Sequence, residues 1–378
     1  MHKLFFGQPK VRLSGIIGSS ISSLLLMGAL SFTSLLGLFG CKNQAKNSGH
    51  PILIVSYPVS LREQADEKSA EIEQLESGDE LADLNRTSRF LASIYLDGRL
   101  RQEPWLWVET SSGRQGWVFA GAVLPEGTNT DQQLNWVLEK RFQALFGLQL
   151  SQRWKAWTSR KDLITTDSAF AQVLREGMAL QDTLNQLMAT LATRDPGQTP
   201  PDMYWLGDSS PYFIIQQIPN QNSYSLFLDY KAVGKQATQT SGEEDDRFAQ
   251  IGFLTFPLDS IGSTLPAWVF PLSLEESCSN LGAGMHFNIL RAIDQTLQKG
   301  KLFAPELMAL KNWILDDILD KDRSYWQPQE KILTELGQIR KAKLTCLTAR
   351  DQLALEARQA MFESPEKNNL HLNRRTGE

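Results

Sequence analysis

The chain has 378 residues, a formal net charge of −5 and a hydrophobic content of 42%. This composition is typical of a globular protein long enough for two domains beyond any targeting segment, and it excludes a wholly disordered chain. No long basic run supplies the clustered Lys and Arg side chains that bind nucleic-acid phosphates, so we expect no nucleic-acid partner.

The first 40 residues have the pattern of an export signal. Residues 1–12 carry three basic side chains and no acidic one, and residues 13–40 carry no charged side chain at all. In such a signal the basic start stays on the cytoplasmic side while the apolar stretch enters the bilayer. We therefore expect the rest of the chain to lie outside the cytoplasm.

The apolar stretch ends at a cysteine. Leu38-Phe39-Gly40-Cys41 resembles the lipobox of bacterial lipoproteins, with Phe39 standing where a small residue is usual. The resemblance implies a signal peptide at residues 1–40, a lipid anchor on Cys41 and a polar tether at residues 41–50. The alternative is an uncleaved membrane anchor, since about 20 apolar residues suffice to span a bilayer. Both alternatives place the protein at a membrane of the cell envelope.

Short apolar or alternating runs, separated by turn residues, fill residues 51–125. This spacing predicts about five short strands in a small, strongly curved barrel. The expected strands are 52–55, 59–61, 71–75, 105–108 and 115–118.

The order of landmarks in the same stretch resembles the bacterial SH3 (SH3b) family. The landmarks are Leu61-Arg62, then Ile72 and Leu75 before Gly78, then Trp105-x-Trp107-Val108, and finally Gly113-Arg114-x-Gly116-Trp117-Val118. A loop at residues 85–103 is longer and more charged than the family usually has. The resemblance implies an all-β, SH3-like barrel at residues 51–125.

Members of the SH3b family often bind cell-wall peptides, glycopolymers or partner proteins in an aromatic groove. The resemblance implies a groove lined by Phe90, Tyr95 and Trp105, in which Arg62 or Arg114 pairs with an anionic group of the ligand. For Tyr95 and Trp105 a place in the hydrophobic core is the alternative. Trp107 and Trp117, on alternating strands, are expected to be buried.

Residues 131–363 are predicted to form an α+β domain with helices packed on an antiparallel sheet. The apolar spacing predicts helices at 131–146, 168–192, 287–297, 305–319 and 328–362, the last as one long helix. Strands are expected at 212–215, 224–230, 251–256 and 268–270. Residues 364–378 are polar and are predicted to be a disordered tail.

Two cysteines remain if Cys41 carries lipid. Cys278 and Cys346 are then expected to form a disulfide, because an exported protein folds where disulfides persist. Two separate buried thiols are the alternative.

A cell-wall hydrolase is the enzymatic alternative, because SH3b domains commonly accompany such enzymes. Ser277-Cys278-Ser279-Asn280 weakly resembles the nucleophile motif of a family of wall-cleaving cysteine peptidases. That chemistry needs a His on a later strand to take the thiol proton. His286 lies at a predicted helix start and His371 in the predicted tail, so neither position fits.

The four His residues show no ligand spacing, and no phosphate-binding loop is present, so we expect neither a metal nor a cofactor. The sequence therefore predicts a lipid-anchored envelope protein with a binding or scaffolding role rather than an enzyme. Its expected contacts are the membrane and either peptidoglycan or another envelope protein.

Overall fold

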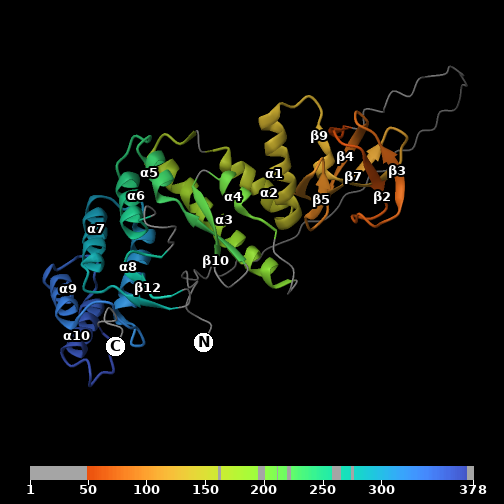
Figure 1. The fold of residues 1–378 in the computed structure, drawn as a ribbon. Coiled ribbons are helices and arrows are strands. Elements are labelled where there is room, and N and C mark those ends of the chain that lie inside the picture. Colours follow the sequence, from red (N-terminus) through yellow and green to blue (C-terminus); the bar gives the residue numbers. More distant parts are fainter. Residues whose placement is uncertain are drawn as a thin grey trace, which may run out of the picture. The chain divides into compact units, whose positions relative to one another are not determined.

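The computed structural model describes residues 49–160, 163–194, 201–210, 212–218, 223–257, 265–273 and 276–372. Residues 50–378 form one compact unit. Its described part has two hydrophobic cores, one among β-strands up to residue 123 and one among the later helices. The chain is thus built from a β-region followed by a helical region (Figure 1).

The β-region is a seven-stranded antiparallel sheet in the order β3-β2-β8-β7-β4-β1-β9. Its inner face buries aliphatic side chains such as Leu53, Leu106 and Val118, none of which is exposed to solvent. The strands are β1 (Ile52–Val55), β2 (Val59–Arg62), β3 (Glu71–Leu75), β4 (Glu80–Thr87), β7 (Trp105–Thr110), β8 (Gln115–Phe119) and β9 (Val123–Pro125).

The expected loop at residues 85–103 is in large part a separate hairpin. Strands β5 (Ala92–Leu96) and β6 (Arg99–Glu103) pair antiparallel with each other and form a sheet of their own. Asp97 and Gly98 connect them, both with positive φ, as the tight turns that suit hairpins require. The five strands expected from the sequence are present, whereas β4, β9 and this hairpin were missed.

Helix α1 (Thr130–Phe146) joins the two regions. Its Trp136 packs against the core of the β-region, and its Phe142 belongs to the core of the helical region. Lys140 Nζ lies 2.6 Å from Asp83 Oδ2 on β4, with both side chains almost fully buried. Arg141 binds both carboxylate oxygens of Glu103 on β6, at 2.5 and 2.9 Å.

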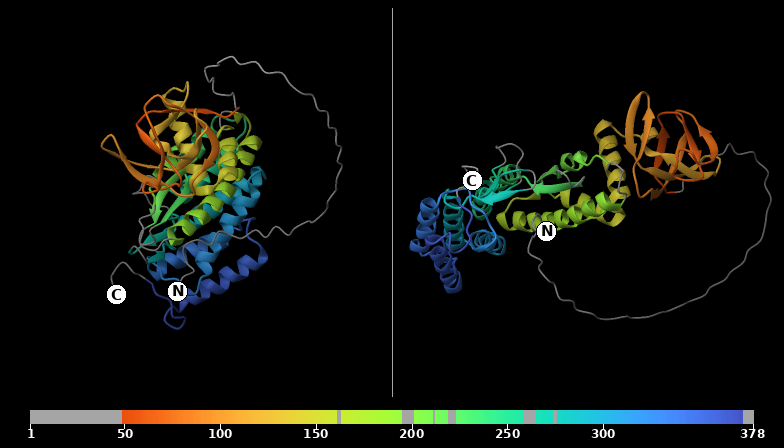
Figure 2. Two further views of the ribbon diagram at one scale, coloured as in Figure 1. Left: turned by 90° about the vertical axis from the view of Figure 1, so that its right-hand side faces the viewer. Right: turned by 60° about the horizontal axis from the view of Figure 1, so that its bottom comes forward.

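The helical region contains small sheets rather than the single sheet expected. The long helix α3 packs along β11 of the β10–β11 hairpin (Figure 2). The strands are β10 (Phe213–Ile218), β11 (Ser223–Leu228), β12 (Val269–Pro271) and β13 (Ser277–Ser279). The remaining helices are α2 (Leu148–Thr158), α3 (Asp167–Arg194), α4 (Tyr204–Asp208), α5 (Tyr230–Ala237), α6 (Glu244–Thr255), α7 (Met285–Lys299), α8 (Ala304–Leu319), α9 (Gln329–Lys341) and α10 (Ala349–Glu363).

The expected strand at residues 251–256 is wrong, because this segment is the end of α6. Glu244, Asp245 and Asp246 fill the first turn of that helix, where the helix dipole favours acidic side chains. The residues that α6 buries also recur at helical spacing, among them Phe248 and Ile251.

The single helix expected at 328–362 is two helices. Lys343 adopts a left-handed backbone conformation with a φ of 49°, which ends the first helix. Thr348 and Asp351 then form a capping box that starts α10.

The described part of the predicted tail is ordered. Leu370 is buried in the helical core, and the carbonyl oxygen of His371 accepts a hydrogen bond from the amide of Tyr325 at 2.8 Å. The expectation of disorder is therefore wrong for residues 364–372, while the residues after them lie outside the described part. No helix in the described ranges is both long and apolar enough to cross a membrane.

We predict that Lys140→Met lowers the free energy of unfolding by about 3–5 kcal/mol, because it leaves the Asp83 carboxylate buried and unpaired. Urea denaturation measures the change. Replacing both partners, Asp83→Leu with Lys140→Met, is expected to restore most of the loss. The matched control is Lys155→Met, whose exposed pair with Glu139 is expected to contribute at most about 1 kcal/mol. Equal losses for Lys140→Met and Lys155→Met would contradict the role given to the buried pair.

Candidate functional site

The residues expected to line a ligand groove do not share one environment. Tyr95 is 73% exposed and Phe90 48% exposed, whereas Trp105 is only 2% exposed. Trp105 is therefore a buried residue rather than a groove residue. Arg62 donates to the Ser69 carbonyl oxygen at 2.6 Å, and the largely exposed Arg114 donates to the Ile72 carbonyl oxygen at 3.2 Å.

The pairing of β7 with β8 explains where the tryptophans lie. Trp105 pairs with Phe119 and Trp107 with Trp117, so these four residues share one face of the two strands. Leu106, on the opposite face, points into the hydrophobic core. The aromatic stripe thus lies on the outer face of the sheet.

The two ends of this stripe differ in exposure. Trp105 and Phe119 are buried and pack edge to face, with ring centroids 5.9 Å apart. Trp107 and Trp117 are half-buried and pack edge to face at 5.3 Å. The expectation that Trp107 and Trp117 are core residues is therefore wrong, because alternation places them opposite the core-facing side chains.

An arginine that the sequence analysis missed completes the open end. Arg86 on β4 pairs with Trp107, and its guanidinium lies 5.6 Å from the Trp107 ring centroid and 5.1 Å from that of Trp117. Arg86 is exposed and forms no ion pair with any described residue. We call Arg86, Trp107 and Trp117 the Arg86 cluster.

The Arg86 cluster can bind an anionic or planar group at the surface. A guanidinium stacked on aromatic rings keeps its N–H donors free at its edge, and carboxylates are the groups that such donors bind in a bidentate manner. No pattern in the sequence indicated Arg86, because the β4–β7 register shifts between Asp83 and Arg86 at the left-handed Asn85.

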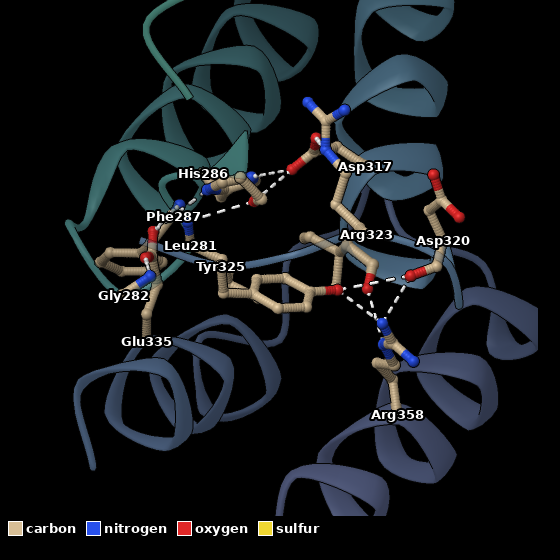
Figure 3. A network of polar contacts seen from close by, with 12 residues as sticks. Leu281, Gly282, His286, Phe287, Asp317, Asp320, Arg323, Tyr325, Glu335 and Arg358 are labelled. Carbon is tan, nitrogen blue, oxygen red and sulfur yellow. Dashed lines mark hydrogen bonds and ion pairs between the residues drawn. The ribbon is translucent and has the colours of Figure 1, made fainter. Parts of the chain in front are cut away.

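A second candidate is a buried polar network in the helical region (Figure 3). Asp317 on α8 lies at its centre: its Oδ2 accepts from Ser279 at 2.5 Å and lies 2.9 Å from His286 Nε2. Its Oδ1 lies 3.1 Å from Arg323 Nε. Ser279, His286 and Asp317 are the residue types of a hydrolase triad. Here, however, the serine and the histidine both contact one oxygen of Asp317 rather than each other.

Glu335 on α9 holds the start of α7 in the same network. Its carboxylate accepts hydrogen bonds from the backbone amides of Gly282, Gly284 and Phe287, at 2.5, 3.0 and 3.0 Å. These amides lie at and just before a helix start, which favours negative charge. His286 Nδ1 lies 3.9 Å from Glu335 Oε1, so the histidine is placed between two carboxylates.

Arg358 on α10 closes the other side of the network (Figure 3). It donates to the backbone carbonyls of Ile318 and Asp320 and to the hydroxyl of Tyr325, at 2.9, 2.5 and 2.5 Å. Burial raises the pKa of Tyr325 to about 12. Because His286, Tyr325 and Arg358 are all buried, this network joins helices rather than meeting a substrate.

The cysteines do not form the expected disulfide. Cys278 and Cys346 are both present as buried thiols. The sulfur of Cys278 lies 3.7 Å from the carbonyl oxygen of Phe270, and that of Cys346 lies 4.0 Å from the carbonyl oxygen of Leu290. Each thiol thus donates to the backbone of a different element. The disulfide expected from the sequence is therefore wrong, and the alternative of two separate buried thiols holds.

The arrangement around Cys278 differs from that of a cysteine peptidase. Cys278 has no exposed surface, and His286 contacts Asp317.

Within the described ranges, no group of three or more His, Cys, Asp and Glu side chains is placed to hold a metal ion. The predicted lipidation site, Cys41, lies outside the described residues.

The chain matches no protein-family model and no curated protein.

We predict that the two thiols resist Ellman's reagent in the folded protein at pH 8, because both are buried and burial raises the pKa of Cys346 to about 12. In residues 50–378, both thiols are expected to react in guanidinium without a reductant, and Cys346→Ala should halve the signal. No reaction under those conditions would instead indicate a disulfide.

The raised pKa of Cys346 also makes the stability of the fold depend on pH. Since the folded-state pKa of Cys346 lies above its ordinary value of 9.0, the protonated thiol favours folding. The contribution of Cys346 to the free energy of unfolding is therefore fully present below about pH 9 and is lost as the pH rises toward 12.

Proposed function

We propose that the protein is a bacterial cell-envelope lipoprotein, exported by its leader and held at the membrane through a lipid on Cys41. A basic start, a charge-free stretch and a cysteine at its end support this proposal. The polar residues 42–50 then act as a tether for the folded part of the chain.

The β-region is, in this proposal, an SH3b-type module that binds an anionic ligand of the envelope. The seven-stranded antiparallel sheet and the sequence landmarks between Leu61 and Val118 support the family assignment. The ligand class is a wall peptide or a partner protein that presents a carboxylate.

The observation that carries the binding role is the Arg86 cluster. An exposed arginine that forms no ion pair within the described part of the chain, lying over Trp107 and Trp117, offers a cationic and aromatic surface. Trp and Arg are the residues that most often dominate binding energy at interfaces. The cluster lies on the outer face of the sheet, so a ligand can reach it without disturbing the core.

The helical region serves as the scaffold of this protein. Its buried charges bind one another and the backbone, as Asp317 and Glu335 do. Buried networks of this kind rigidify a fold and specify one arrangement of its helices.

We predict that Arg86→Ala reduces retention on purified peptidoglycan by about tenfold, because a charge-assisted hydrogen bond to a ligand carboxylate is lost. A pull-down with quantified bound fractions measures this. The matched control is Arg291→Ala, since Arg291 is also exposed and stacked on an aromatic ring, 5.4 Å from the centroid of Phe287 on α7. Unchanged retention of Arg86→Ala, or an equal loss in Arg291→Ala, would contradict a binding role for the cluster.

Mass spectrometry of the mature N-terminus tests the anchor. The expected product begins at Cys41 and carries the mass of a diacylglyceryl thioether. With Cys41→Ser, the lipid mass is expected to disappear and the leader to remain. A product of wild type that keeps Met1 and carries no fatty acid would refute the lipoprotein assignment.

A further inference from the structure

The β5–β6 hairpin exposes apolar side chains that nothing in the described fold covers. Tyr95 and Leu100 are directly paired across the two strands, and they are 73% and 50% exposed. Phe90, just before the hairpin, is 48% exposed. Two large apolar side chains exposed side by side, as Tyr95 and Leu100 are, form a candidate contact surface.

The hairpin is held so that these side chains stay outward. Arg101 donates to the carbonyl oxygen of Gly121 at 3.3 Å and lies over the ring of Tyr57 at 5.0 Å. Glu103, at the base of the hairpin, forms the bidentate pair with Arg141. Because Ile94 pairs with Arg101, alternation places Tyr95 and Leu100 on the face opposite to these anchoring contacts.

The segment that leads into the hairpin and through its turn is basic although the chain is acidic. Residues 86–101 contain four arginines and one acidic residue, whereas the whole chain has a formal net charge of −5. Arg89 and Arg99 are exposed and form no ion pair with any described residue. Cations beside exposed aromatic rings are the combination found where proteins contact the headgroup region of a bilayer.

The length of the tether favours the bilayer as the partner. If Cys41 carries lipid, residues 42–50 are all that separate the first strand from the membrane. Such a segment spans at most about 30 Å when fully extended. The phosphates of the leaflet are then always within reach of the β-region.

We propose that the β5–β6 hairpin binds the surface of an anionic bilayer. Tyr95 and Leu100 enter the interface. Arg89, which precedes the hairpin, and Arg99, which follows its turn on the opposite face of the strand from Leu100, bind lipid phosphates at the edge of this contact. This inference rests on the proposed lipid anchor, because the anchor supplies the proximity. It gives the protein a second membrane contact that orients the β-region.

Sedimentation with vesicles tests the hairpin independently of the anchor. Residues 50–378 form one compact unit that contains both described cores, so this part is used without leader or lipid. We expect it to sediment with vesicles of phosphatidylcholine and phosphatidylglycerol in a 7:3 ratio, and to remain in solution with phosphatidylcholine alone. Because the protein is acidic overall, such binding requires a local basic patch.

Two variants assign the binding to the hairpin. Arg89→Gln with Arg99→Gln is expected to lower the partition coefficient by about fivefold per arginine. Tyr95→Ser with Leu100→Ser is expected to remove the apolar part of the contact, so that the binding that is left is electrostatic and is lost as the salt concentration rises. The control, Arg153→Gln, changes an exposed arginine of α2 and should bind as wild type does.

Equal sedimentation with both vesicle types, or full binding by both hairpin variants, would overturn the proposal. Loss of peptidoglycan retention in the hairpin variants without vesicle binding would also overturn it, and would assign the hairpin to the wall. Failure of the anchor is seen separately, as a mature chain without lipid, so the two proposals fail by different measurements.

Discussion

Two buried ion pairs connect helix α1 to the β-region, and the rest of the structure depends on them. Lys140 neutralises Asp83 on β4, and Arg141 binds Glu103 at the base of the hairpin. Burial raises the pKa of Glu103 even though Arg141 lowers it, which shows how strongly this joint is desolvated. Arg86 lies three positions after Asp83 on β4. The ion pair between Lys140 and Asp83 therefore also holds the part of β4 that carries Arg86.

The helical region also pairs its buried charged side chains with partners inside the fold. Asp317, Glu335 and Arg358 satisfy backbone and side-chain groups of five different segments, so the residue types that suggest catalysis are engaged in packing. His286 lies between Asp317 and Glu335 with no exposed surface. In the β-region, by contrast, Arg86, Phe90 and Tyr95 stay exposed to solvent.

Local patterns predicted most of the elements, and long-range pairing decided the rest. Alternating runs such as 105–108 became strands, and the spacing at 287–297 became α7, because period and burial agree there. The run at 251–256 reads as a strand alone but belongs to a helix that starts seven residues earlier. The candidate site depends on which face of β7 meets the core and on a register shift near Asn85. Neither can be predicted from one segment, because both depend on how strands distant in the sequence pair.

The contact between the amide of Tyr325 and the carbonyl of His371 joins segments that the ribosome makes far apart in time. Tyr325 also forms a bridge to Ser279, so three distant stretches meet at one residue. The helical region is therefore incomplete until residue 371 has been synthesised. In the export that we propose, the polypeptide passes through a membrane pore before it folds. The late closure of this contact then leaves the helical region unfolded until the whole chain has crossed.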